Sequence, residues 1–273
     1  MTSTSSFGAW GWGWGKDMVS DAWITPADIP AAEAAALKWL YDNTAGASWT
    51  DNTNWGKTAV ANDWFGITVA GGKVTGLNVN ANNLVGDITS WAIDAFTGAT
   101  LVIYLYDNAG VTGVISGWSL PATLYTIFLS GTGITGGLPT IPAATGYFIV
   151  NNTSLSGDIS GTTLSANMRQ MHLHSTGFSG APIMTSAVAL RDLQYGNCGL
   201  SQANVDAVLL GIYSRRASFT FAAPTLGIAG TNSTPSGVYQ DGDPPTTGKE
   251  YEFELENDPE TEGFNVWVIT STA

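Results

Sequence analysis

The sequence has little positive charge and few charged residues of either sign. Nine Lys and Arg stand against 22 Asp and Glu, which gives a formal net charge of −13 at pH 7. Nucleic acids and anionic membranes are bound by positive surfaces, so this balance argues against both classes of partner. Charged residues make up 11% of the chain, whereas roughly a quarter is usual in globular proteins. We attribute the acidity to solubility.

Cysteine and long apolar runs are also scarce. Cys198 is the one cysteine of the chain, which excludes an intrachain disulfide. No apolar run reaches the roughly 18 residues that a membrane-spanning helix needs. The N-terminal stretch MTSTSSFGAWGWGWGK lacks the basic region and the continuous apolar stretch of a signal peptide. We therefore expect no membrane insertion, and a chain that is cytoplasmic before it joins a virion or an extracellular assembly.

Glycine and tryptophan are abundant instead, with 33 and 11 residues. Hydrophobic residues make up 44% of the chain, which excludes disorder on compositional grounds. A sequence rich in Gly, Asn and Thr with so few charges favours turns and short strands over a helix bundle.

From about residue 74 a short apolar pattern repeats. In each repeat a central apolar residue is followed two positions later by another, so both point to the same side of a short strand. The central residues are Leu77, Ile103, Ile127, Tyr147, Met171, Leu193 and Leu226. Successive subtraction gives steps of 26, 24, 20, 24, 22 and 33 residues, and all but the last are typical of stacked solenoid coils.

A small polar residue or a cysteine stands five positions after each central residue. Such a side chain can bond backbone groups of the adjacent coil that would otherwise be buried without a partner. These residues are Asn82, Asn108, Thr132, Asn152, Thr176, Cys198 and Thr231.

The stretch VTGLNVNANNLVGDI resembles the plant-type leucine-rich repeat, L-x-L-x-x-N-x-L-x-G-x-I-P, and later coils keep similar endings such as LSGDI. The segment before it resembles the N-terminal cap of that family, including its W-x-G-[IV] motif at Trp64, Gly66 and Ile67. The resemblance covers about residues 28–235. It implies a leucine-rich-repeat solenoid, mostly β with short irregular or 3-10 segments on the convex side.

Two departures from the plant pattern are present. The paired cysteines of plant caps are missing, and the second and fourth coils carry one extra residue before Val111 and Leu155. Both favour a microbial or bacteriophage-like version of the family.

We expect four segments along the chain: a Trp/Gly arm (1–25), an N-terminal cap with a helix (26–73), a solenoid of about seven coils (74–235) and a C-terminal loop and β-hairpin (236–273). In the cap helix, Asp28 is the expected N-cap and Glu33 is expected to face outward. A second helix, capped by Ser201, explains the long last step.

The hairpin is predicted from the strict alternation in KEYEFELE and from the apolar segment FNVWVIT that follows the turn NDPE. It could cap the open end of the solenoid or dock on another chain.

The arm alternates tryptophan with glycine. At the period of a strand, Trp10, Trp12 and Trp14 would all point to one face, where exposed indoles would have to be covered. Either they fold back on this chain's own core, or they anchor the chain in a neighbouring subunit.

The candidate binding residues flank the two inward positions of each coil, on the face that the family makes concave. Tyr104, Tyr106, Phe128 and Phe148 would form an apolar stripe across neighbouring coils, and His172 and His174 would follow it. An exposed apolar stripe with a polar rim marks a contact site. The alternative is that the arm or the hairpin of the same chain covers it.

No residue set predicts catalysis, a metal or a cofactor. Two histidines can begin a zinc site, but no Cys or carboxylate supplies the remaining ligands at a recognisable spacing. The nucleophile motif G-x-S-x-G, the zinc motif H-E-x-x-H and a phosphate-binding loop are all missing from the sequence.

We expect a non-enzymatic structural or assembly protein, a subunit of a virion, fibre or filament, whose partners are its own copies or other particle subunits. The alternative is an adhesin-like recognition module that binds protein or glycan through the aromatic face. A polysaccharide hydrolase would require a pair of catalytic carboxylates on one strand face, and the sequence offers none.

Overall fold

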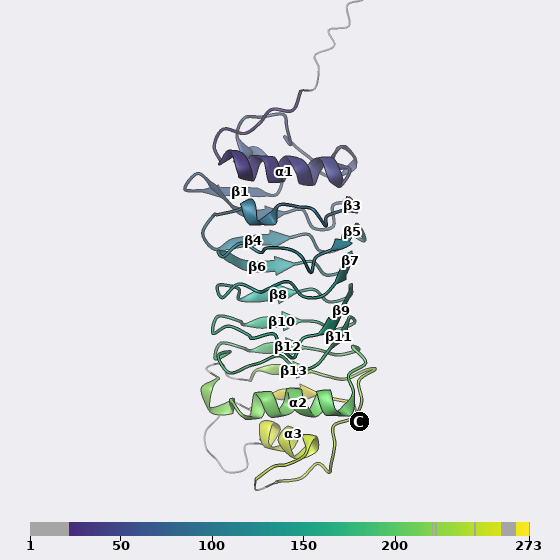
Figure 1. Ribbon diagram of the computed structural model, residues 1–273. Coiled ribbons are helices and arrows are strands. Elements are labelled where there is room, and N and C mark those ends of the chain that lie inside the picture. The colour runs from purple at the N-terminus through teal and green to yellow at the C-terminus, as the bar shows by residue number, and fades with distance from the viewer. Residues whose placement is uncertain (1–21, 220, 222, 243, 258–265, 273) are drawn as a thin grey trace, which may run out of the picture.

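The computed structural model describes residues 22–219, 221, 223–242, 244–257 and 266–272. The chain winds into a solenoid whose coils stack from helix α1 (Ala31–Asn43) at one end to helix α3 (Gly248–Asn257) at the other (Figure 1). Each coil contributes one short strand to a large sheet. Most coils also contribute a strand to a smaller sheet on the flank. Because the same coils build both sheets, the two sheets enclose one hydrophobic core.

The large sheet has nine strands in the order β1-β2-β4-β6-β8-β10-β12-β13-β14. All neighbours are parallel except β1 and β2, which are antiparallel. The strands are β1 (Ile67–Ala70), β2 (Lys73–Asn78), β4 (Leu101–Tyr104), β6 (Leu124–Phe128), β8 (Tyr147–Ile149), β10 (Gln170–His172), β12 (Asp192–Gln194), β13 (Thr225–Gly227) and β14 (Val268–Thr270).

The flanking sheet is parallel and has five strands in the order β11-β9-β7-β5-β3. Short 3-10 helices lie at Gly46–Ser48, Ala61–Asp63, Ile93–Ala95 and Arg216–Ser218. The five strands are β3 (Val85–Asp87), β5 (Gly110–Val114), β7 (Gly133–Gly136), β9 (Ser154–Asp158) and β11 (Gly177–Ser179).

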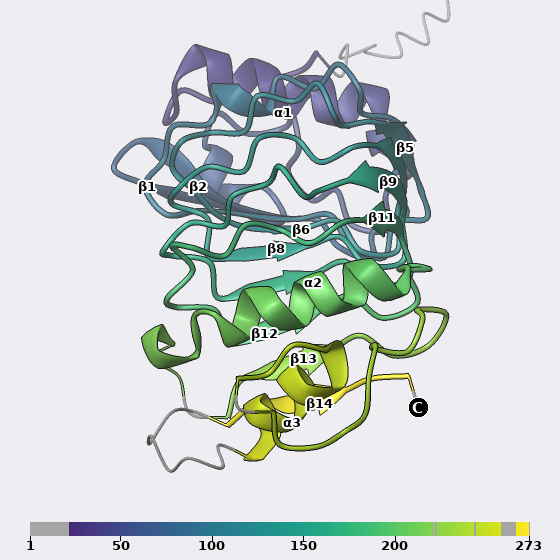
Figure 2. The ribbon, with the colours of Figure 1, turned by 60° about the horizontal axis from the view of Figure 1, so that its bottom comes forward.

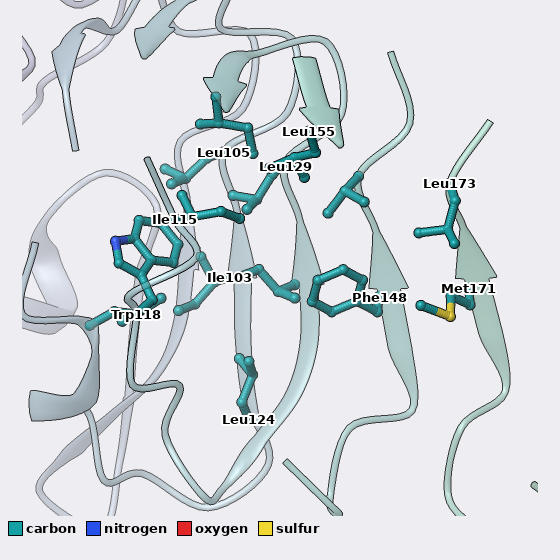
Figure 3. Packing of buried hydrophobic residues seen from close by; sticks show 14 of the residues in the cluster. Ile103, Leu105, Ile115, Trp118, Leu124, Leu129, Phe148, Leu155, Met171 and Leu173 are labelled. Atoms are coloured by element: carbon teal, nitrogen blue, oxygen red, sulfur yellow. The ribbon is translucent and has the colours of Figure 1, made fainter. Parts of the chain in front are cut away.

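The core is built by the inward apolar pairs of successive coils. Figure 3 shows Ile103, Leu129, Phe148 and Met171 directed from the large sheet into the interior, with Trp118 from the return path on the Ile103 side. When Phe148 is taken as the central residue of the fourth coil, each central residue is at most 1% exposed, as is the apolar residue two positions later. Each such burial stabilises the fold by about 1.5–3 kcal/mol. The coils therefore depend on their neighbours, as expected for a solenoid.

In several coils the polar residue after the inward pair links adjacent coils. Asn108 is 1% exposed. Its Oδ1 accepts hydrogen bonds from the N–H groups of Asn82 (2.9 Å) and Leu84 (3.0 Å), and its Nδ2 donates to the carbonyls of Val79 (2.9 Å) and Leu105 (2.8 Å). In the third coil the hydroxyl of Thr132 instead donates to the Leu129 carbonyl of its own coil (2.6 Å). The predicted bond to the adjacent coil is confirmed for Asn108 and for Cys198, but Thr132 and Thr176 bond a carbonyl of their own coil.

The predicted frame of the fourth coil was wrong by one residue. Phe148, not Tyr147, pairs in register with Ile127 and Met171, and Thr153, not Asn152, is the linking residue, through Oγ1 to the Val150 carbonyl (2.8 Å). Tyr147, Phe148, Ile149 and Val150 are all apolar, so alternation could not choose between the two frames. With the corrected frame, the extra residue before Leu155 disappears.

In the last coil the linking residue is Asn232 rather than the predicted Thr231. Asn232 Nδ2 donates to the carbonyls of Tyr195 (2.9 Å) and Ile228 (2.8 Å), and its Oδ1 accepts from the N–H of Leu200 (2.9 Å). This coil therefore holds one additional residue between its inward pair and its linking residue.

The N-terminal cap forms around a cluster of aromatic rings that includes Trp49, Trp55 and Trp64, each at most 5% exposed. The ring centroids lie 4.9 Å apart between Trp49 and Trp55 and 5.2 Å apart between Trp55 and Trp64. Trp23 also joins the cluster, with its ring centroid 5.3 Å from that of Trp64. Residues of the predicted arm from Trp23 onward therefore belong to the cap.

Two details of the cap helix differ from expectation. Helix α1 begins after Pro30 without a side-chain cap, and Asp28 instead accepts hydrogen bonds from the N–H groups of Ala61 and Asn62. Glu33 was expected to face outward but is fully buried. Its carboxylate accepts from the N–H of Val74 (2.7 Å) and of Thr97 (2.9 Å), which ties the helix to the first coils.

Helix α2 (Gln202–Tyr213) occupies the return path between β12 and β13, as predicted (Figure 2). Ser201 caps it by accepting from the N–H of Asn204 (3.4 Å). Its buried residues are the expected Val205, Val208, Leu209 and Ile212.

The predicted C-terminal β-hairpin is not formed. The segment predicted as its first strand is helix α3, and β14 pairs with β13 in parallel, so it extends the large sheet. The physical reason is a capping box at Thr247 and Glu250: the Thr247 N–H donates to the Glu250 carboxylate (3.0 Å), and the Glu250 N–H donates to Thr247 Oγ1 (3.4 Å). α3 packs on α2, where the ring centroids of Tyr213 and Tyr251 are 5.3 Å apart.

Within the described residues, no helix is both long and apolar enough to cross a membrane.

Candidate binding face on the large sheet

The candidate site is the outer face of the large sheet, on the side away from the core. We call it the outer sheet face. Each coil contributes three residues to this face: the residue before the central inward residue, the residue after it, and the residue three positions after it. The strand registers, and the backbone hydrogen bonds that follow each strand, align these residues from coil to coil. From β2 to β13, the position after the central residue holds Asn78, Tyr104, Phe128, Ile149, His172, Gln194 and Gly227.

Three rings gather on this face at β4 and β6. The ring centroids of Tyr104 and Phe128 are 4.8 Å apart, those of Tyr104 and Tyr106 are 6.1 Å apart, and those of Tyr106 and Phe128 are 6.3 Å apart. All three side chains are partly exposed. We call Tyr104, Tyr106 and Phe128 the aromatic patch. Burial, together with the neighbouring Tyr106 and Tyr147, raises the pKa of Tyr104, so its hydroxyl keeps its proton at neutral pH.

Phe148 does not belong to the patch, contrary to expectation. It is fully buried and packs in the core. Because of the one-residue shift in the fourth coil, Tyr147 and Ile149 take the outward positions. Ile149 is 7% exposed, so it forms a floor beside the patch.

Tyr147 is a residue that the sequence analysis missed. Its hydroxyl accepts a hydrogen bond from Arg191 Nη2 (2.8 Å), and the guanidinium lies 5.6 Å from the Tyr147 ring centroid and 5.0 Å from that of Phe221. The spacing between the linking residue and the later Leu155 and Gly157 could have given the correct frame of this coil, and with it the outward position of Tyr147. In the first coil Leu84 and Gly86 stand two and four positions after Asn82, and the same spacing selects Thr153.

His172 and His174 lie next to each other on the outer sheet face, as predicted, with ring centroids 6.1 Å apart. His172 Nε2 is 2.6 Å from Asp192 Oδ2. Asp192 also accepts hydrogen bonds at Oδ1 from Gln194 Nε2 (2.7 Å) and Thr225 Oγ1 (2.6 Å). Burial raises the pKa of Asp192, but the hydrogen bonds from His172, Gln194 and Thr225 together lower it by more, so the net shift is downward. Asp192 is therefore a carboxylate at neutral pH.

His174 has a different environment from His172. Burial and the neighbouring His172 lower its pKa, while Asp192 opposes this shift. Its Nδ1 is buried and has no hydrogen-bond partner among the described residues. At neutral pH this imidazole is therefore uncharged.

A shallow depression of about 430 Å³ lies beside His174. It exists because small residues occupy outward positions on the last coils, where earlier coils carry rings. It is lined by Gly196, Gly227, Ala229, Gly230, Gln194, Asn197, Thr270 and His174.

The described residues contain no group of three or more His, Cys, Asp or Glu side chains that could hold a metal ion. Among them, neither imidazole is hydrogen-bonded to a hydroxyl or a thiol. Cys198 donates to the Leu173 carbonyl (3.2 Å), and burial raises the pKa of its thiol. That thiol is therefore poorly suited to nucleophilic chemistry.

Trp10, Trp12 and Trp14 lie outside the described residues. The C-terminal residues that the structure describes do not form the cover that a hairpin would provide. Helix α3 packs on α2 at the end of the solenoid, away from the aromatic patch on β4 and β6 (Figure 1).

No protein-family model and no curated protein matches the sequence. Among solved structures, a chain from the crystal structure of the BIR3–SERK2 complex of Arabidopsis thaliana aligns with 60% of this chain and 93% of that chain, at 17% identity and a TM-score of 0.38. We assign the fold from the coils, registers and linking residues of this molecule itself. The chain is a leucine-rich-repeat-like solenoid.

Proposed function

We propose that this solenoid is a non-catalytic scaffold that holds a partner on its outer sheet face. The observation that carries the proposal is the aromatic patch, in which three rings on adjacent coils remain partly exposed. Aromatic side chains are enriched in the cores of interfaces, because they exclude much apolar surface from water at little entropic cost. Neither hydroxyl of the patch has a hydrogen-bond partner among the described residues, so both are available to a ligand.

The absence of catalysis is part of the proposal. The pKa direction of Cys198 supports it, because burial keeps the thiol protonated. The carboxylate of Asp192 is already engaged by His172, Gln194 and Thr225.

We further propose that the chain is a subunit of a larger assembly, a virion, fibre or filament, with the tryptophan arm as its connector. The alternation of Trp10, Trp12 and Trp14 with glycine supports this role, as does the missing cysteine pair of plant caps, which favours a microbial or bacteriophage-like origin. The arm and the outer sheet face would then have separate roles, the first in assembly and the second in recognition.

The test of the binding face compares three labelled proteins: the wild type, the patch variant Tyr104→Ser/Tyr106→Ser/Phe128→Ser, and the flank variant Val85→Ser/Val114→Ser. Val85 and Val114 are 52% and 46% exposed on the flanking sheet, so their replacement matches the change in polarity at another site. Each protein is applied to a printed array of defined glycans and to a displayed library of random peptides.

The proposal predicts ligands that bind the wild type and the flank variant and lose at least tenfold in affinity with the patch variant. Ligands that bind all three proteins equally would place the binding surface elsewhere and refute the proposal. Circular dichroism and thermal melting of each variant show whether the fold is kept.

A further inference from the structure

The geometry points to a neutral oligosaccharide as the ligand of the outer sheet face, laid across the strands from the aromatic patch toward the depression beside His174. This inference depends on the proposed function, because it names the chemical class of the ligand for the same face.

The outer sheet face is almost uncharged although the chain carries a net charge of −13. Along β2 to β13, the three outward positions of each coil hold one carboxylate, that of Asp192, and neither Lys nor Arg. His172, Gln194 and Thr225 already engage this carboxylate. The Arg191 guanidinium reaches this face beside Tyr147, but it already donates to the Tyr147 hydroxyl and lies over the Tyr147 and Phe221 rings. A charged ligand would lose hydration on this face and would meet no further opposite charge at the outward strand positions, which is costly. A neutral ligand avoids that cost.

The backbone of the sheet favours a sugar over a peptide. Strands β4 to β12 each pair with a strand on both sides, so their N–H and C=O groups are already used within the sheet. A peptide that binds by strand addition needs a free sheet edge, and the interior of this face offers none. A peptide lying across it would have to satisfy its own backbone groups with side chains alone. A sugar has no such backbone.

The side chains of the face suit the two surfaces of a pyranose ring. The rings of Tyr104 and Phe128 can pack against its C–H face. Amide side chains flank them: Asn78 pairs in register with Tyr104, and Asn151 accepts a hydrogen bond from Ser130 (2.8 Å) beside Phe128. An amide offers both a donor and an acceptor, which matches neighbouring hydroxyls of one sugar.

The depression provides a second contact region at the other end of the face. Its glycines make room for a ring, and His174 is one of its lining residues. The distance from β4 to β12 is four strand spacings, roughly 19 Å. A ligand that contacts both regions is therefore an oligosaccharide of several units rather than a single sugar.

The experiment uses the full chain and isothermal titration calorimetry with neutral hexasaccharides (maltohexaose, cellohexaose and chitohexaose), their trisaccharides, and an acidic hyaluronan hexasaccharide. We expect at least one neutral hexasaccharide to bind, its trisaccharide to bind at least tenfold more weakly, and the acidic hexasaccharide not to bind. Tyr104→Ala and His174→Ala should each weaken binding at least tenfold. Tyr104→Phe, which keeps the ring, should change affinity by less than threefold, and Val114→Ala on the flank by less than twofold.

Binding of no neutral hexasaccharide overturns the inference, as does tighter binding of the acidic one. If the peptide library instead yields ligands that depend on the aromatic patch, the proposed function holds and the sugar assignment fails. If a hexasaccharide binds but Tyr104→Ala and His174→Ala leave its affinity unchanged, both fail, because the binding surface lies elsewhere.

Discussion

At the scale of single residues, the linking positions decide whether the coils can stack. Asn108 accepts from two backbone N–H groups of the preceding coil and donates to one carbonyl of that coil and to two of its own. The threonines at equivalent positions donate to one carbonyl of their own coil, as Thr132 and Thr153 do. At this position side-chain hydrogen bonds therefore join Asn108 to its neighbouring coil, whereas Thr132 and Thr153 make no such bond between coils among the described residues.

Replacement of Asn108 by Ala should lower the free energy of unfolding by about 3–5 kcal/mol, because each unpaired buried polar group costs roughly 1–3 kcal/mol. Asn108→Thr should cost less, since a hydroxyl can still donate to the Leu105 carbonyl. Urea denaturation followed by circular dichroism measures both. Equal losses for Ala and Thr would contradict the assigned role, and Asn80→Ala on the outer sheet face serves as the control with little effect.

The residue scale also shows where sequence reasoning stops. The repeat pattern located the linking residues in most coils, but it failed in the last coil, which holds one additional residue, and in the fourth, where four apolar residues in a row fit either frame. The backbone resolves the choice: Asn152 has φ of 55°, matching Asp107 with 57°, and both stand just before a linking residue. Apolar burial alone could not reveal this left-handed turn, and for that reason Phe148 was assigned to the wrong face and Tyr147 was missed.

At the scale of elements, the two C-terminal helices differ in how well the sequence predicts them. The apolar positions of α2 recur at helical spacing, so its cap and its buried face were both predicted correctly. In α3 the strict alternation of Tyr251, Phe253 and Leu255 with glutamates indicates a strand, but the helix forms because Thr247 and Glu250 cap its first turn. Local capping thus prevailed over side-chain periodicity in a segment with only a few buried residues.

The cap of α3 should make the stability of this helix depend on pH. Hydrogen bonds from the Thr246 N–H and from Gln240, followed by those from Thr246 Oγ1 and the Thr247 N–H, lower the pKa of Glu250 from 4.5 to about 2. A carboxylate with a lowered pKa stabilises the folded state above its unfolded pKa, and this contribution is lost as the pH falls from about 4.5 toward 2.

The variant Glu250→Gln should therefore melt below the wild type at pH 6, and the difference should shrink to nothing near pH 2. Melting temperatures between pH 2 and pH 6 check this. The control is Asp94→Asn, an exposed acid that makes no side-chain hydrogen bond among the described residues. A difference between wild type and Glu250→Gln that stays constant over this range would refute the assigned contribution of the carboxylate.

At the scale of the whole molecule, the repeat pattern was sufficient to predict a solenoid, because one coil cannot bury its own apolar face and stacking is the remaining solution. The two ends were harder to predict. At the first end Glu33 and the tryptophan cluster close the core, and at the last end α3 and the buried Trp267 do so. These contacts are specific to each end and do not repeat, so the repeat pattern of the sequence does not predict them.

The structure also defines where the arm must be cut to test assembly. Trp23 packs on Trp64, and the Ile24 N–H donates to the Gly56 carbonyl (2.7 Å), so a deletion of residues 1–25 would damage the cap. A deletion of residues 1–21 leaves these contacts in place. If the arm connects subunits, light scattering should show oligomers for the full chain and monomers for the deletion.

The full chain with Trp10→Ser/Trp12→Ser/Trp14→Ser separates the indoles from the rest of the arm. Monomers from this variant as well as from the deletion would assign assembly to the three rings, because burial of exposed indoles in a neighbouring subunit is the favourable term that the substitutions remove. Monomers from all three proteins would refute the connector role. The proposed partner binding would then depend on the outer sheet face.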